Sequence, residues 1–272
     1  MKCVLTIAGS DSSGGAGIQA DLKTMTCLGV FGMSAVTALT AQNTTGVRDV
    51  LEATPEFVGE QLDCVFEDIR PQAVKIGMVS SAPIIRAIGA KLRQYEAENI
   101  VVDPVMVATS GSALMQGSAL TALMEELFPL AAVITPNIPE AERLCGFAIE
   151  TGEDMLRAAE TIGKTLPGAV LVKGGHRTDC ADDLLWQKGQ ASWFRAPRVD
   201  NPNNHGSGCT LSSAIASFLA LGEDLPGAVE KAKAYITAAM EARLDLGRGS
   251  GPLWHNYAIP EGGQVGGKGD RT

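Results

Sequence analysis

A glycine-rich segment in front of an apolar helical pattern is the part of the sequence best suited to chemistry. It runs from residue 200 to residue 210 and places Gly206-Ser207-Gly208 directly before Cys209. Small residues at a helix start leave backbone N–H groups unpaired, and these groups attract anions together with the positive end of the helix dipole. A thiol there is expected to have a lowered pKa, so Cys209 is the candidate base. The alternative is a glycine-rich helix cap around an inert, buried thiol.

A second glycine-rich loop, Gly9–Gly17, follows the first β-branched run of the chain. It lacks the Lys-Ser/Thr ending of a Walker A loop. Residues 15–20 come close to the dinucleotide-binding fingerprint, but the match begins several residues after the strand. In addition, no acidic residue between Asp21 and Asp49 could hold a ribose, so an oxidoreductase is a poor interpretation. A ligand loop at the carboxyl end of a strand is favoured over a flexible surface turn.

Two further strand ends carry residues that bind heterocycles and phosphates. Gln42 follows the second run, and a carboxamide can pair with a heterocycle that has both a donor and an acceptor. A turn that only caps the strand explains Gln42 equally well. Lys173 leaves an apolar run into a Gly-Gly loop, where its charge can reach a phosphate. The alternative for Lys173 is an ordinary lysine between a strand and a loop.

Polar and acidic residues at two more strand ends suggest a magnesium ion. Asp103 closes an apolar run and precedes a proline; it can hold Mg²⁺ through water or simply start a turn. Asn137 and Glu140 are three residues apart at a helix entrance, so both can face one Mg²⁺–phosphate cluster. Taken alone, this pair is better explained as a helix N-cap with an acid in the first turn. Chance is a poor explanation for five strand ends that all carry such residues.

Short β-branched runs alternate with longer helical patterns, which predicts an α/β fold with a mostly parallel central sheet and helices on both faces. The expected strands are Val4–Ala8, Ser34–Leu39, Ala73–Ile76, Ile100–Val102, Ala132–Ile134 and Ala169–Val172, followed by an antiparallel hairpin of Asp183–Gln187 and Ala191–Phe194. The expected helices are Ala16–Leu28, Pro55–Phe66, Ala82–Glu96, Ser118–Phe128, Pro139–Leu144, Asp154–Leu166, Cys209–Leu221 and Leu225–Leu246. One domain is expected over residues 1–260, and the glycine-rich tail 261–272 is expected to be disordered.

Composition narrows the possible partners. The 272-residue chain has a formal net charge of -9, which argues against nucleic acid as its main partner because phosphate-backbone binding needs clustered Lys and Arg. The six cysteines are scattered and only 3 histidines occur, so a zinc site is not expected. Free thiols of this kind suit the cytoplasm. The apolar runs are too short or too polar for a signal peptide or a membrane span.

Together these segments resemble the ribokinase-like carbohydrate and vitamin kinases, and the fit is closest to the hydroxymethylpyrimidine/phosphomethylpyrimidine kinases of thiamine biosynthesis. The resemblance covers about residues 4–259. Its most specific pieces are residues 8–21, 40–44, 75–78, 135–141, 172–176 and 205–210. It implies a ribokinase-like three-layer fold, with ATP and Mg²⁺ as cofactors. We also expect a homodimer.

The resemblance implies roles on the substrate side of the site. Gln42 would hydrogen-bond an aminopyrimidine ring. The other expected substrate-binding residues, which would wall the ring or lie beside it, are Gly9, Ala16, Asp21, Met78 and Val105.

It also implies roles on the ATP side. Asn137 and Glu140 would hold Mg²⁺–ATP, with Glu140 and Asp103 contacting the metal through water. Lys173 would meet the ATP phosphates. The catalytic set is expected to be Gly206, Ser207, Gly208, Cys209 and Lys173, with the three backbone positions forming an anion hole and Cys209 near the substrate hydroxymethyl group.

Three features of the segment 200–210 stand out against the family pattern. Most ribokinase-like kinases carry Asp where Cys209 stands, whereas Cys is a mark of the pyrimidine kinases and of some pyridoxal kinases. Ser207 replaces a common Thr. The stretch Asn201-Pro202-Asn203-Asn204 replaces a Lys- and Thr-containing one, which leaves the adenine-side and phosphate-side contacts open.

The expected reaction is ATP-dependent phosphorylation of 4-amino-5-hydroxymethyl-2-methylpyrimidine, followed by phosphorylation of its monophosphate to the diphosphate. The first alternative is a pyridoxal or pyridoxine kinase on the same fold, since both ring types are flat heterocycles with a hydroxymethyl arm. A second alternative is a non-catalytic pyrimidine sensor, which would not need Glu140, Lys173 and Cys209 together.

Overall fold

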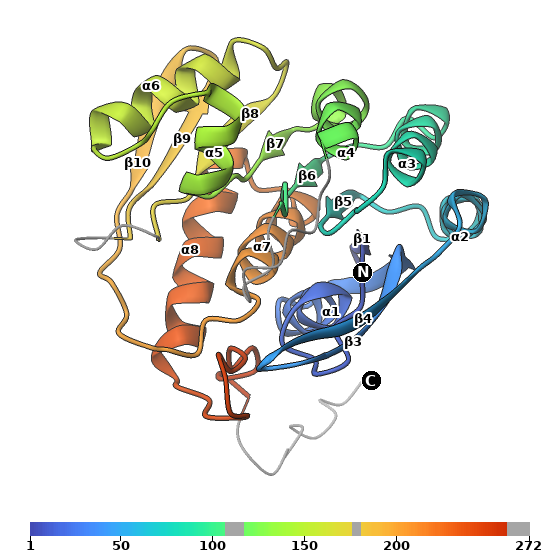
Figure 1. Ribbon diagram of the computed structural model, residues 1–272, viewed down its shortest axis with the longest axis horizontal. Coiled ribbons are helices and arrows are strands. Elements are labelled where there is room, and N and C mark those ends of the chain that lie inside the picture. Colours follow the sequence, from blue (N-terminus) through green and yellow to red (C-terminus); the bar gives the residue numbers. More distant parts are fainter. Residues whose placement is uncertain (107–116, 176–180, 260–272) are drawn as a thin grey trace, which may run out of the picture.

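A mixed sheet forms the centre of the molecule (Figure 1). The structure is a computed structural model, and it describes residues 1–106, 117–175 and 181–259. Within this part of the chain, eight strands pair in the order β10-β9-β8-β7-β6-β5-β1-β2. They are β1 (Cys3–Ala8), β2 (Phe31–Val36), β5 (Ala73–Ile76), β6 (Ile100–Val102), β7 (Val133–Ile134), β8 (Ala169–Val172), β9 (Asp183–Gln187) and β10 (Gln190–Phe194). The neighbours from β2 to β8 are parallel, whereas β9 and β10 are antiparallel.

Helices cover both faces of this sheet, as the alternating pattern predicts. One face carries α2 (Pro55–Asp68), α3 (Ala82–Gln94), α4 (Gly117–Ala122), α5 (Ile138–Cys145) and α6 (Gly152–Gly163). The other face carries α1 (Gly17–Cys27), α7 (Ser207–Leu221) and α8 (Leu225–Glu241). Helix α4 continues into the π turn η1 (Leu123–Leu127) and the 3-10 turn η2 (Phe128–Leu130). The three-layer α/β architecture is confirmed.

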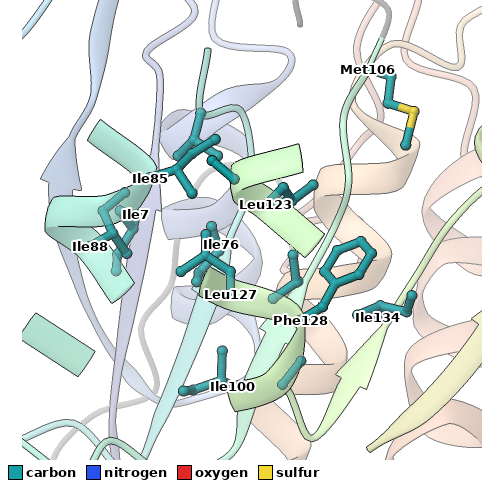
Figure 2. Packing of buried hydrophobic residues seen from close by; sticks show 14 of the residues in the cluster. Ile7, Ile76, Ile85, Ile88, Ile100, Met106, Leu123, Leu127, Phe128 and Ile134 are labelled. Atoms are coloured by element: carbon teal, nitrogen blue, oxygen red, sulfur yellow. The ribbon is translucent and has the colours of Figure 1, made fainter. Parts of the chain in front are cut away.

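The core follows from the two-residue period of the strands, which sends alternate side chains to opposite faces. Figure 2 shows Ile7, Ile76 and Ile134 on one face, packed against helical residues such as Ile85 and Phe128. Their strand neighbours, including Ala73, Val101 and Val133, belong to the second core cluster under α7 and α8. Because both faces of the sheet are covered, the central parallel strands are mostly apolar; the buried exceptions are Thr6 in β1 and Lys75 in β5, which both bind Asp21.

The region after β2 differs from the prediction. One strand was expected over Ser34–Leu39, but β2 ends at Val36 and a separate strand β3 (Ala38–Asn43) begins at once. It forms a two-stranded antiparallel ribbon with β4 (Gly46–Glu52), which is not among the predicted strands. Most side chains of β4 are exposed, so the strand has no buried face to produce an alternating pattern.

The other expected elements are present, with ends that shift by a few residues. The largest shift is at α8, which ends at Glu241 rather than Leu246 because the chain turns there into the segment that closes on the Asn201–Asn204 stretch. The predicted tail, residues 261–272, lies outside the described residues, as do His176 and Cys180. Within the described part of the chain, no helix is long and apolar enough to span a membrane.

Candidate active site

The carboxyl ends of the parallel strands meet at one edge of the sheet, and the predicted site residues follow them there. Asp103 comes directly after β6, Lys173 directly after β8, and Gly9 directly after β1. In front of this edge lies a cavity of about 910 Å³. Open α/β sheets bind their ligands at this position.

Nearly all residues predicted for the site line this cavity. They are Gly9, Ala16, Gln42, Met78, Asp103, Val105, Asn137, Glu140, Lys173, Gly206, Ser207, Gly208 and Cys209. The exception is Asp21. Its side chain is fully buried in α1, where its Oδ2 accepts hydrogen bonds from Lys75 Nζ at 2.7 Å and from Thr6 Oγ1 at 2.6 Å. Asp21 therefore cannot touch a ligand in the cavity, and its predicted place among the substrate contacts is corrected to a buried ion pair below it.

The N-terminus of α7 is built as the glycine pattern suggests. Gly206 has φ +82°, and a Cβ there would collide with the carbonyl oxygen of Gly15, so glycine alone fits. A Cβ on Gly208 would lie 3.1 Å from Asp103 Oδ2 and 3.4 Å from Lys173 Nζ. No side chain within the described residues caps the start of this helix. Its first backbone N–H groups thus lie beside a lysine ammonium at the cavity wall.

Lys173 and Asp103 form an ion pair at the base of the cavity. Lys173 Nζ donates to Asp103 Oδ1 at 2.6 Å, and Thr135 Oγ1 donates to the same oxygen at 3.1 Å. Burial alone would lower the pKa of Lys173, but the negative charges of Asp103 and Glu140 outweigh it and raise that pKa. The lysine therefore stays charged and can offer its ammonium group to a phosphate.

Asn137 and Glu140 form a reciprocal cap at the start of α5. Asn137 Oδ1 accepts from the Glu140 N–H, and Glu140 Oε2 accepts from the Asn137 N–H, both at 2.9 Å. The capping interpretation is therefore confirmed. Burial and the nearby charge of Asp103 raise the pKa of Glu140 to about 7, although Lys173 works against this. The carboxylate still lines the cavity, so capping and ligand contact are compatible.

Cys209 is half-buried and lies between the starts of two helices. It belongs to the first turn of α7, and its sulfur accepts a hydrogen bond from the backbone N–H of Gly17, the first residue of α1. The expected lowering of its pKa is wrong. Burial raises the pKa of Cys209 to about 11, and the charge of Lys75 and the Gly17 N–H only partly offset this. The thiol is thus protonated at neutral pH.

Gln42 lies where the β3–β4 pairing is irregular. The register shifts between Ala41 and Gln42, and such a bulge re-aims the side chain that follows it. The Gln42 backbone is fixed to Ser12, whose hydroxyl bonds both its carbonyl and its N–H. The carboxamide contacts Thr40 Oγ1 at 3.2 Å and His205 Nε2 at 3.3 Å. It lines the cavity at a point remote in sequence from Lys173 and α7.

Two cavity residues, Asp11 and His205, received no role in the sequence analysis. His205 Nε2 lies 2.8 Å from Asp11 Oδ2, across 194 positions of sequence. Asp11 also accepts hydrogen bonds from Ser13 and from the backbone N–H groups of Gly15 and Ala16. Both residues stand inside the singled-out glycine-rich segments, and that position was the available signal.

The Asn201–Asn204 stretch binds the end of α8 and the segment that follows it, residues 240–251. Asn201 Nδ2 donates to the Met240 carbonyl at 2.8 Å, and Asn203 Nδ2 donates to the Leu244 carbonyl at 3.1 Å. Asn203 Oδ1 accepts from the Gly251 N–H at 2.9 Å. The asparagines therefore hold residues 240–251 beside the segment that leads into α7.

Comparison with known proteins identifies the family. Residues 11–254 match the family model described as phosphomethylpyrimidine kinase. The chain belongs to this family. It is 53% identical over 255 residues to the hydroxymethylpyrimidine/phosphomethylpyrimidine kinase of Rhizobium meliloti, covering 92% of this chain and 96% of that protein. It is also 52% identical to the thiamine biosynthesis bifunctional protein ThiED of Geobacter sulfurreducens, and there it spans 53% of the longer protein's length.

Solved structures of kinases support the same assignment. The phosphomethylpyrimidine kinase of Clostridium difficile 630 has a TM-score of 0.79 and 48% identity, covering 88% of this chain and 99% of that one. A pyridoxal kinase from Staphylococcus aureus in complex with AMP-PCP and pyridoxal has a TM-score of 0.86 and 35% identity, with 94% of each chain covered. The ribokinase-like fold implied by the resemblance is thereby confirmed, and this member of the phosphomethylpyrimidine kinase family is a kinase.

Proposed function

We propose that the protein transfers the terminal phosphoryl group of ATP to 4-amino-5-hydroxymethyl-2-methylpyrimidine, and then phosphorylates the monophosphate to the diphosphate in thiamine biosynthesis. One observation carries the proposal: a single cavity is lined by the carboxamide of Gln42 and by Lys173 with the open start of α7. The first suits a heterocycle with neighbouring donor and acceptor groups, and the second suits phosphates. A ring bound at Gln42 can thus direct its hydroxymethyl arm toward a bound phosphate.

ATP would lie with its phosphates at Lys173 and the α7 N-terminus. Mg²⁺ prefers oxygen ligands and typically uses one or two carboxylates together with substrate phosphates and water. Asp103 and Glu140 fit this donor set, because both carboxylates line the cavity and the negative charge of Asp103 is close enough to raise the pKa of Glu140. When bound, Mg²⁺ would neutralise charge on the phosphates. Asn137 would support the site by holding Glu140 in place.

The chain's own part in the reaction is to position the reactants and stabilise charge, because phosphoryl transfer needs little covalent help. The α7 backbone N–H groups and Lys173 would receive the negative charge on the transferred group. A thiol with a pKa of about 11 can accept the hydroxyl proton only if it gives up its own in the same step. We therefore assign Cys209 as a proton relay between the hydroxymethyl oxygen and a phosphoryl oxygen, with no resident thiolate.

The alternative substrate is pyridoxal or pyridoxine. The fold likeness to a pyridoxal kinase favours this alternative, and the hydroxymethyl arm of these rings would meet Cys209 in the same way. The Gln42 carboxamide favours the aminopyrimidine, which offers a matching amino group beside a ring nitrogen. A sensor without catalysis is disfavoured, because it would not require Lys173, Asp103 and Cys209 around one helix start.

The deciding experiment incubates the protein with Mg-ATP and each of four acceptors: the hydroxymethylpyrimidine, its monophosphate, pyridoxal and pyridoxine. Products are identified by mass. The proposal expects a monophosphate and a diphosphate from the pyrimidines, at a higher kcat/KM than for either pyridine. In Gln42→Leu, the pyrimidine KM should rise by roughly 5- to 100-fold, because the polar edge of the pyrimidine loses its hydrogen bonds to the carboxamide. The ATP KM should stay within about twofold, because ATP does not contact Gln42 in this proposal. Faster phosphorylation of pyridoxal by the unmodified protein would favour the alternative.

We further propose a homodimer in the cytoplasm. Leu39 and Leu51 stand directly opposite each other on the β3–β4 ribbon and are 54% and 69% exposed. Val50, next to Leu51, is 41% exposed, so the ribbon carries several exposed apolar side chains, and contiguous exposed apolar surface marks interaction sites. Light scattering of the purified protein should give twice the chain mass of 28.3 kDa, and Leu51→Asp should halve it. A monomer in the unmodified protein would contradict the homodimer.

A further inference from the structure

The side chain of Gln42 lies between His205 and Thr40, and the other contacts of each partner determine whether it can donate or accept a hydrogen. As placed, Gln42 Nε2 lies 3.3 Å from His205 Nε2, and Gln42 Oε1 lies 3.2 Å from Thr40 Oγ1. The two ends of a carboxamide have nearly the same shape, so their partners decide which end carries the hydrogens.

At the His205 end, the ring nitrogen facing Gln42 must be a donor. Asp11 is buried, and its carboxylate accepts hydrogen bonds from Ser13 and from the Gly15 and Ala16 N–H groups. These contacts and His205 hold the pKa of Asp11 well below its usual range, against the effect of burial. An ionised carboxylate only accepts, so the His205 Nε2 at 2.8 Å from it carries a hydrogen. That hydrogen points mainly at Asp11, and a protonated ring nitrogen has no lone pair, so nothing at this end could accept a hydrogen from a Gln42 NH₂ group. A Gln42 oxygen there could share the Nε2 hydrogen with Asp11.

At the Thr40 end, the hydroxyl can only accept. Thr40 Oγ1 donates its single hydrogen to the Ser10 carbonyl at 2.7 Å. Its lone pairs then face the second end of the Gln42 carboxamide, where an oxygen would meet an oxygen. Both ends therefore call for the same change: nitrogen toward Thr40 and oxygen toward His205.

We infer that Asp11 and His205 are positioning residues that lock the Gln42 carboxamide with Oε1 toward His205 and Nε2 toward Thr40. The lock is rigid because the backbones on both sides are fixed. Gln42 is bound at its backbone by Ser12, and the His205 N–H donates to the Gly251 carbonyl at 3.1 Å. A Cβ on Gly15 would lie only 2.6 Å from His205 Cδ2, so the loop Gly9–Gly17 closes over the imidazole.

The fixed orientation of Gln42 determines which hydrogen-bonding groups a bound ring must present to the cavity. This consequence rests on the proposed function, in which Gln42 binds the ring. One Gln42 N–H is taken by Thr40, and the second is free to donate to a ring nitrogen. The free lone pair of Oε1 can accept from an amino group on the His205 side. The selected ligand is thus a heteroaromatic ring with an acceptor nitrogen next to an exocyclic amine, in one orientation only.

The orientation is tested by NMR on the ligand-free protein labelled with ¹⁵N and ¹³C. Gln42→Leu identifies the Gln42 NH₂ signals, and His205→Gln identifies the imidazole signals. The inference expects nuclear Overhauser contacts from the Gln42 NH₂ protons to the Thr40 side chain, together with a hydrogen bound to His205 Nε2. Contacts from those NH₂ protons to the His205 ring, or a bare Nε2, would overturn it.

The effect on recognition is tested by steady-state kinetics. His205→Gln and Thr40→Val should each raise the KM for the aminopyrimidine by roughly 5- to 50-fold, with kcat and the ATP KM changed by less than about threefold. Thr40→Ser keeps the hydroxyl and should restore the KM. His255→Gln, a buried histidine that does not line the cavity, serves as the control for general loss of stability. Equal rises in the KM values of ATP and pyrimidine would show a merely structural role.

These two measurements separate the inference from the proposed function. The NMR result needs no turnover, so an enzyme that ignores the pyrimidine can still show the predicted lock. Conversely, the enzyme could phosphorylate the pyrimidine while its Gln42 NH₂ group faces His205. That result would support the proposed function and refute the lock.

Discussion

Acid should destabilise the protein through His255, a buried imidazole behind the start of α7. His255 is 4% exposed, and its Nε2 lies 3.0 Å from Thr210 Oγ1 in the first turn of that helix. Burial, with a contribution from the charge of Lys23, lowers the pKa of His255 from 6.5 to about 4. Between these two values the unfolded chain binds a proton at this residue and the native protein does not. The free energy of unfolding therefore falls as the pH falls through this window.

The size of the effect follows from the same two values. A fall from 6.5 to about 4 spans about 2.5 pH units, and each unit corresponds to about 1.4 kcal/mol. The full effect is thus about 3 kcal/mol, of which about 2 kcal/mol is lost on going from pH 7 to pH 5. Because the side chain is almost fully buried, little of this is screened by solvent.

The assay is urea unfolding of the unmodified protein and of His255→Gln, between pH 5 and pH 7. Subtracting the two curves cancels the contributions of other titrating groups, including Glu140, whose raised pKa acts in the opposite direction. The unmodified protein should lose about 2 kcal/mol more than the variant over this range. Tyr235→Phe is the matched control, because it removes the hydrogen bond from the Tyr235 hydroxyl to the His255 carbonyl but keeps the imidazole. A pH-independent difference between unmodified protein and His255→Gln would refute the reasoning.

Three further predictions concern the phosphate end of the cavity. Cys209→Ala should slow single-turnover phosphoryl transfer by about 100-fold or more while leaving ATP binding intact; iodoacetamide should modify Cys209 about tenfold faster per pH unit from pH 7 to pH 10, since its pKa is about 11. A rate near that of the unmodified protein would remove Cys209 from the proton path. Glu140→Gln should shift the Mg²⁺ titration of activity to higher concentration with little change in urea midpoint; an unchanged titration would leave Glu140 as a cap only. Gly208→Val should abolish transfer, because its Cβ would start 3.1 Å from Asp103 Oδ2, whereas Ser207→Ala should be nearly silent.

The fold and the membership of the site could be predicted because they depend on local patterns. Apolar runs such as Ala169–Val172 are buried on both faces and are typical of parallel strands, and parallel strands bring their carboxyl ends to one edge. The residues after those strands, such as Asp103 and Lys173, therefore had to meet. The β3–β4 ribbon was missed for the converse reason, since the exposed strand β4 carries no signal of burial.

Pairing between side chains was less predictable, because it depends on contacts that periodicity does not encode. Asp21 stands near a glycine-rich loop, yet its position on α1 directs it to Lys75, 54 residues away, and not to the cavity. Lys233 and Asp183 form another buried ion pair across 50 residues, and its carboxylate holds the Gly174 N–H beside Lys173. No local pattern around Lys233 or Asp183 predicts that the two side chains form a pair.

The pKa of Cys209 shows why a correct local rule can give the wrong sign. The helix start does lower a thiol pKa, and the Gly17 N–H and the Lys75 charge act in that direction too. The sequence could not reveal that burial is the larger effect, nor that Asp21 and Asp103 add negative charge nearby. A thiol held protonated between two helix starts suits a site whose donors must attract phosphate, because a resident thiolate would repel it.

The variant Cys209→Asp tests this argument, because most ribokinase-like kinases are expected to carry an aspartate at this position. A charged base in the same cavity should change the pH profile of phosphoryl transfer and also weaken ATP binding. Unaltered ATP affinity in that variant would show that charge at this position is of no consequence to the phosphates.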